Sequence, residues 1–273
     1  MTTHPSAKFG DRYDILTELS HGEHHTSYAA RHRTLDRDVS ITVLRAATPA
    51  ERNLLGVIAA DARILGAIRN DHILPVLDSQ WLSDTELALV RPRVKGTTLR
   101  SLIQGAGTLS PKRTEELLRE IGGVLEWSSR NGIVHRYVSP DSICILQGSK
   151  KVMVSFGPPV ELEEGQGDGA AVAPAASPRM LRHCTDSNSL ATLGFAMLTG
   201  HEPLGGEGSL RHLRPDVPPP MAEVVDEGLR CDGQAGMMPL ASFMARLGGA
   251  GSSPRDAGLA SRAVRATPTA GRM

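Results

Sequence analysis

Aromatic residues are scarce in this chain: there are four Phe, three Tyr and two Trp among 273 residues. Proteins that bind single-stranded nucleic acid usually stack the bases on aromatic rings, so this scarcity argues against that class. The charge balance argues the same way, because 30 basic and 30 acidic residues give a formal net charge of zero. Such a chain has no overall attraction to phosphate backbones. We therefore expect no nucleic-acid partner.

Closely spaced cysteines, which a zinc site or a disulfide framework would need, are also lacking. The three cysteines lie far apart, at positions 144, 184 and 231, and form no C-x-x-C pair. Three histidines do cluster, at positions 21, 24 and 25. Three histidines on one turn lack a fixed ligand cage, so we expect them to be solvated. The sequence predicts no metal site.

Long apolar runs are missing as well. No stretch approaches the roughly 20 apolar residues that cross a bilayer as a helix. Residues 1–8 are polar and lack the apolar core of a secretion signal. These observations predict a cytoplasmic chain with reduced thiols and without a membrane span.

The patterning that is present divides the chain into a strand-rich part and a helical part. From Tyr13 to about Asp84, alternating and β-branched runs indicate strands, interrupted by one helix over about 50–68. After Gly96 the periodicity becomes helical, and Ser110 followed by Pro111 is typical of a helix start. We expect helices over residues 111–131, 186–200, 220–230 and 240–247. The sequence predicts an α+β protein in which two lobes form one domain.

Three segments do not fit a packed fold. Residues 1–9 and 248–273 are polar or rich in small residues, so we expect a flexible N-terminus and a flexible tail. Residues 158–176 have no periodicity and carry four acidic residues but no basic one. A loop of this length inside a domain is either functional or disordered.

The segment from Gly132 to Ile145 resembles the catalytic loop of bacterial Ser/Thr protein kinases, whose pattern is H-R-D-L-K-P-x-N. Other family motifs follow in order: a degenerate Gly-rich loop over 19–28, the V-A-I-K strand over 39–42, the hinge over 90–93, and D-F-G at 155–157. The resemblance covers about Phe9 to Leu247. It implies a two-lobed protein kinase-like fold over 10–247, with a small β-rich N-lobe (about 10–90) and a larger α-helical C-lobe (about 94–247).

The resemblance also shows which catalytic groups have been replaced. Phosphoryl transfer needs charge placed against the triphosphate and oxygen ligands for Mg²⁺. Hydroxyl groups are weak sole ligands for that cation, and a phenol is a poor base at neutral pH. The degenerate equivalents are Thr42 for the phosphate-binding Lys, Asp61 for its Glu partner, Tyr137 for the catalytic Asp, Ser139 for the loop Lys, Ser142 for the metal-binding Asn, and Ser155 for the metal-binding Asp.

The nucleotide pocket of the family is altered too. Adenine is normally held between apolar side chains, and most ligand pockets are apolar. The resemblance assigns Gly22, Ser27, Ser40, Val90, Arg91, Arg93 and Cys144 to this pocket. Because serine and cysteine replace Val, Ala and Leu there, we expect no cofactor. ATP bound without Mg²⁺ is the alternative.

Fold-supporting positions of the family are retained. The resemblance assigns Leu65, Leu77, His135 and Phe156 to a structural spine, and Asp186 to its anchor. Apolar burial and a buried carboxylate support a fold whether or not it is catalytic.

These observations predict a catalytically inactive protein kinase-like domain, that is, a pseudokinase. We expect it to act as a scaffold or allosteric regulator of a protein partner, such as a signalling protein or an active kinase. The alternatives are a Ser/Thr protein kinase, or an ATP-binding sensor, with a rearranged active site.

Overall fold

A computed structural model describes residues 9–133, 135, 138–156, 186–205, 208–230 and 238–247. The predictions for the two flexible ends, for the acidic segment 158–176 and for Tyr137 lie outside the described residues.

The N-lobe is built on a five-stranded antiparallel sheet with the strand order β1-β2-β3-β5-β4. Alternation in the first strands places Tyr13, Val39, Ile41 and Val43 in the interior. A short 3-10 turn (Gly10–Arg12) precedes the sheet. The strands are β1 (Tyr13–His21), β2 (His25–His32), β3 (Arg37–Arg45), β4 (Asp78–Ser83) and β5 (Glu86–Pro92).

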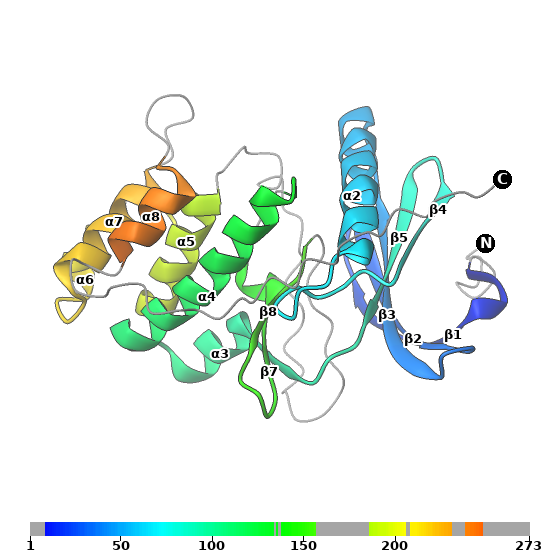
Figure 1. Cartoon of the computed structure of the whole chain (residues 1–273), viewed down its shortest axis with the longest axis horizontal. Coiled ribbons are helices and arrows are strands. Elements are labelled where there is room, and N and C mark those ends of the chain that lie inside the picture. The colour runs from blue at the N-terminus through cyan, green and yellow to red at the C-terminus, as the bar shows by residue number, and fades with distance from the viewer. Residues whose placement is uncertain are drawn as a thin grey trace, which may run out of the picture.

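One long helix, α2 (Pro49–Ala67), packs beside this sheet, as Figure 1 shows. Its start has a reciprocal capping arrangement, in which the Thr48 side chain accepts from the Glu51 backbone N–H and Glu51 accepts from the Thr48 N–H. Leu55, Ala59, Ala62 and Leu65 form its buried stripe. The helix agrees with the predicted range of about 50–68.

The C-lobe is mainly helical (Figure 1). Ser110 caps the longest helix and Pro111 is its first residue, as the sequence predicted. The helices are α3 (Leu99–Ala106), α4 (Pro111–Arg130), α5 (Asp186–Thr199), α6 (Leu210–Leu213), α7 (Pro219–Leu229) and α8 (Leu240–Leu247). In the described part of the chain, no helix combines the length and the apolar character that a membrane span requires.

A second, three-stranded sheet lies at the edge of the C-lobe that faces the N-lobe. Its strands are β6 (Gly96–Thr98), β7 (Ile143–Leu146) and β8 (Val152–Val154), and a 3-10 turn (Pro140–Ser142) leads into β7. Sequence patterning did not predict these strands, because three or four residues are too few to display an alternation.

The two lobes share a hydrophobic core. One cluster of buried side chains runs from Leu55 and Leu65 on α2 to Leu118 on α4 and Leu190 on α5. Backbone bonds add to this contact: the Leu74 N–H donates to the Val154 carbonyl (2.9 Å), and the Val154 N–H donates to the His72 carbonyl (2.8 Å). The predicted α+β, two-lobed kinase-like fold is confirmed.

Candidate active site between the lobes

The candidate site positions come from both sheets. In the N-lobe, Thr42 lies on β3 opposite Ser27 of β2, and Ser40 lies opposite Arg91 of β5. In the C-lobe, Ser142 precedes β7 and Ser155 follows β8. These described positions thus come from β2, β3 and β5 of the N-lobe and from the ends of β7 and β8 in the C-lobe.

Thr42, at the position of the phosphate-binding lysine, points into the protein. Its Oγ1 lies 3.1 Å from the Oγ of Ser27, and both side chains are buried. A short neutral hydroxyl group engaged with a neighbouring strand supplies no positive charge to a triphosphate. Asp61, at the position of the partner glutamate, is half-buried on α2.

Ser142, at the metal-binding asparagine position, is bound to its own turn. Its Oγ donates to the Ser139 carbonyl (2.8 Å) and accepts from the Ser139 N–H (2.9 Å). The Ser155 N–H donates to the Ser142 carbonyl (2.8 Å), which joins this turn to the end of β8. The hydroxyl group at position 142 thus closes a local cap.

Ser155, at the main metal-ligand position, faces a guanidinium group. Nη1 of Arg91 donates to the Ser155 Oγ (2.9 Å), and Nη2 donates to the Phe156 carbonyl (2.8 Å). Arg91 is 2% exposed. A neutral hydroxyl group with a buried cation beside it therefore lies where the kinase family needs an anionic ligand for Mg²⁺.

The role of Arg91 was not found from the sequence, which assigned this residue to the hinge. Val90 and Arg91 lie near the end of β5, whose last residue is Pro92, and the segment that links the lobes follows from Arg93. The sequence did contain one signal for a buried Arg91. Leu87–Val90 is a continuous apolar run, which marks a strand buried on both faces, and the charged Arg91 follows it directly.

The pocket positions Ser40 and Cys144 are both buried, and Cys144 has no exposed surface. Burial raises the pKa of the Cys144 thiol to about 11. Gly96 lies directly against it, since a Cβ at Gly96 would come 2.6 Å from the Cys144 Sγ. Val90 is buried and Arg93 is half-buried.

The turn that replaces the Gly-rich loop is held from within. The Gly22 N–H donates to the His25 carbonyl (2.8 Å), and a Cβ at Gly22 would come 2.7 Å from the His25 imidazole. The expectation that the clustered histidines are solvated is wrong for His25, which is 4% exposed. Its pKa is lowered, chiefly because burial disfavours the charged imidazolium.

Four residues were assigned to the structural spine, and three of them are buried. Leu65, Phe156 and His135 are buried, and the His135 and Phe156 rings lie 4.5 Å apart. Nε2 of His135 is 2.7 Å from the Ser155 carbonyl. The assignment of Leu77 is wrong by one residue, because Leu77 is 37% exposed whereas Val76 is 5% exposed and belongs to the same core as Leu65.

Asp186, the predicted anchor of the spine, is the first residue of α5. Its anchoring role stays a prediction. Tyr137, at the catalytic base position, lies outside the described residues.

These contacts decide whether the described side chains could hold Mg²⁺ and ATP. The described residues contain no group of three His, Cys, Asp or Glu side chains placed to hold a metal ion. The hydroxyl groups of Thr42, Ser142 and Ser155 are each hydrogen-bonded to protein atoms, and Arg91 is the cation beside Ser155. These residues do not fit a Mg²⁺–triphosphate complex.

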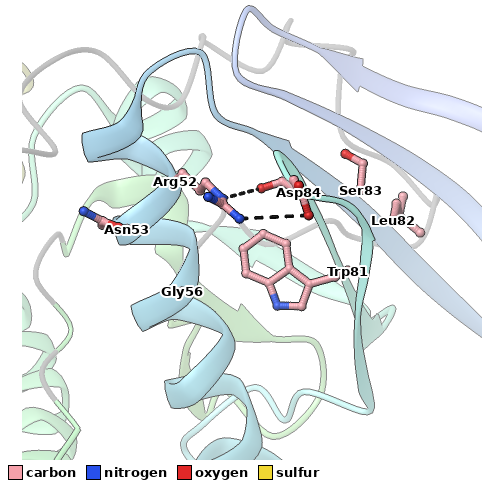
Figure 2. Close-up of a pocket in the computed structure, with 7 residues that line it drawn as sticks. All are labelled: Arg52, Asn53, Gly56, Trp81, Leu82, Ser83 and Asp84. Carbon is pink, nitrogen blue, oxygen red and sulfur yellow. Dashed lines mark hydrogen bonds and ion pairs between the residues drawn. The ribbon is translucent and has the colours of Figure 1, made fainter.

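A separate hollow of about 440 Å³ lies outside this site, between the first turns of α2 and the β4–β5 turn (Figure 2). Arg52 crosses it, and its Nε donates to the Asp84 carbonyl (2.9 Å) beside the indole of Trp81. None of the predicted site positions lines it.

Comparisons with known proteins agree with this architecture. The chain is 28% identical over 235 residues to the serine/threonine-protein kinase PknL of Mycobacterium tuberculosis, an alignment that covers 82% of this chain and 59% of PknL. It is 30% identical over 250 residues to PknB of the same organism, covering 85% of this chain and 39% of PknB. The chain therefore spans well under two thirds of the length of these relatives. No family model matches the chain.

Among solved structures, the kinase domain of Mycobacterium tuberculosis PknI superimposes with a TM-score of 0.66 at 17% identity, covering 87% of this chain and 95% of that one. This likeness shows the fold. Together with the sequence relatives, it places the chain in the bacterial Ser/Thr protein kinase-like family.

Proposed function

We propose that this chain is a catalytically inactive member of the kinase-like family, which acts as a scaffold or allosteric regulator of a protein partner. The observation that carries the proposal is the hydrogen bond from Arg91 to Ser155 Oγ (2.9 Å). A position that must be an anionic metal ligand in a kinase is here the neutral acceptor for a buried guanidinium group. The bonds of Thr42 to Ser27 and of Ser142 to Ser139 support the same conclusion.

The first test measures ATP binding and phosphoryl transfer by the purified chain. We expect no shift of the melting temperature with ATP, with or without Mg²⁺ or Mn²⁺, and no transfer of labelled phosphate to itself or to a generic protein substrate. The kinase domain of PknB, assayed in parallel, controls for the conditions. A shift that needs no metal would favour an ATP sensor, and a Mg²⁺-dependent shift with loss of the γ-phosphate would contradict the proposal.

The second test addresses the partner. If the chain regulates an active kinase, a strain that lacks it will show altered phosphorylation of particular proteins. The purified chain will label none of those proteins. Direct labelling of the same proteins by the purified chain would contradict a purely regulatory role.

A further inference from the structure

Arg91 joins the two lobes through its side chain. Its backbone belongs to β5 of the N-lobe sheet, whereas its two hydrogen-bond acceptors, the Ser155 Oγ and the Phe156 carbonyl, follow β8 of the C-lobe. We call this arrangement the Arg91 bridge. Sixty-four residues separate Arg91 from Ser155, so the bridge is a long-range contact.

The geometry of the bridge restricts motion in a specific way. A guanidinium group is planar, and its donors form a fixed fork, so two acceptors on consecutive residues define both the position and the orientation of the segment. Hydrogen bonds from a charged donor are stronger than neutral ones, and those in a buried site are not weakened by water. Arg91 is 2% exposed and Ser155 has no exposed surface.

Two neighbouring contacts extend the effect of the bridge. His135 bonds the carbonyl of the same Ser155 through Nε2, and its ring packs on that of Phe156. Cys144, on β7, is fully buried and pairs with Met153 of β8, the strand that ends just before Ser155. Release of the segment from Arg91 would therefore loosen the end of β8 and, with it, the pairing of β8 with β7 at Cys144.

We propose that the Arg91 bridge holds the two lobes in one closed arrangement and makes that arrangement independent of nucleotide and metal. The side chain of Arg91 supplies from within the fold the positive charge that would otherwise arrive with a bound metal ion. This proposal rests on the proposed function and extends it. A partner would bind a single arrangement of the two lobes, which nucleotide does not change.

The test uses Cys144 as a probe of opening, in a Cys184→Ser/Cys231→Ser background so that one thiol remains. The full chain is treated with a thiol reagent such as DTNB under native conditions, and the rate of Cys144 modification is measured with and without ATP and Mg²⁺. For Arg91→Met we expect modification to be about tenfold faster or more, because two charge-assisted bonds between the lobes are lost. In the parent chain, which keeps Arg91, the modification of Cys144 should be slow and unaffected by ATP.

Two further variants make the measurement specific. Arg91→Lys keeps the charge but not the fork, so we expect a rate between those of the parent and Arg91→Met. Arg31→Met is the matched control: its ion pairs with Asp36 and Asp38 lie wholly within the N-lobe, and we expect the parental rate.

Hydrogen exchange distinguishes separation of the two lobes from general unfolding. In Arg91→Met, amides of β8 and residues 155–156 should lose protection while those of β2 and α5 keep theirs. Equal modification rates for Arg91→Met and the parent would overturn the inference. Loss of amide protection to the same extent in β8, β2 and α5 would overturn it too. Phosphoryl transfer by the chain would instead refute the proposed function. The Cys144 modification rates would still show whether the Arg91 bridge holds the lobes together.

Discussion

The hydroxyl groups of Ser27 and Thr42 lie 3.1 Å apart on neighbouring strands of the N-lobe sheet, and both are buried. In the kinase family these two positions belong to the nucleotide pocket and to the phosphate-binding lysine. Here they satisfy each other, which removes the cost of burying either hydroxyl group alone.

This pair predicts a specific coupling in a double-mutant cycle. Ser27→Ala and Thr42→Val should each lower the free energy of unfolding by about 1 kcal/mol, because each leaves a buried hydroxyl group without this partner. The double variant should lose clearly less than the sum. Urea denaturation measures all four proteins. The exposed pair Ser83 and Thr85, 3.5 Å apart, is the control and should be additive; additive effects at Ser27 and Thr42 would contradict the expectation.

The Arg91 bridge predicts that a single reversion does not rebuild a metal site. In Ser155→Asp, the new carboxylate would lie next to the Arg91 guanidinium and form an ion pair with it. We expect the melting temperature of this variant to be unaffected by Mg²⁺ and ATP. Ser155→Ala, measured under the same conditions, shows the effect of losing the hydroxyl group alone. A Mg²⁺-dependent rise in the melting temperature of Ser155→Asp would show that Arg91 does not retain the carboxylate.

Arg100 predicts how the candidate catalytic loop is held. Its Nε donates to both Asp141 oxygens (2.7 and 2.8 Å), and its Nη2 donates to Glu202 (2.8 Å). The pair with Asp141 fixes the turn that contains Ser142 against α3. Arg100→Met should lower the free energy of unfolding by about 1–3 kcal/mol, because two half-buried carboxylates lose their cation.

The control for this variant is Arg113→Met, which removes an exposed i,i+3 pair with Glu116. Its effect should stay within about 0.5 kcal/mol, since exposed ion pairs contribute little. Urea denaturation compares the two variants, and equal losses would mean that the Arg100 pairs do not stabilise the C-lobe.

The sequence predicted the fold well where patterns are long. The alternation around Tyr13, the β-branched run before Leu44 and the Ser110–Pro111 helix start all correspond to observed elements. It failed where elements are short, as in β6 to β8, and where one residue of register decides which face is buried, as for Leu77 and Val76.

The sequence predicted which catalytic side chains of the family are absent from the candidate site. It did not predict the contacts that the replacing residues make. Motif order located Thr42, Ser142 and Ser155, because the resemblance fixes positions along the chain. It did not reveal that Arg91 reaches Ser155, because that contact joins two segments that are far apart in sequence and needs the packing of both lobes. The identity of residue 155 shows that the metal-binding carboxylate is missing, whereas only the fold shows that Arg91 bonds the serine found there.

The last prediction concerns acid stability and the buried His25. Burial lowers its pKa below the ordinary value of 6.5, and the nearby His21, Arg45 and His24 act in the same direction. Well above pH 6.5 the imidazole is neutral in both the folded and the unfolded chain, so it contributes no pH dependence there. As the pH falls below this value, the unfolded chain binds the proton first, and the folded state loses stability until its own lower pKa is reached.

His25→Asn should therefore flatten the decline in the free energy of unfolding below about pH 6.5, measured by urea denaturation at each pH. Gly22→Ala provides a second route to the same site, because its Cβ would come 2.7 Å from the His25 ring and force the ring to shift. The exposed His212 supplies the control: His212→Asn should leave the decline unchanged. If His25→Asn and the parent lose stability in parallel over this range, protonation of His25 is not what weakens the N-lobe in acid.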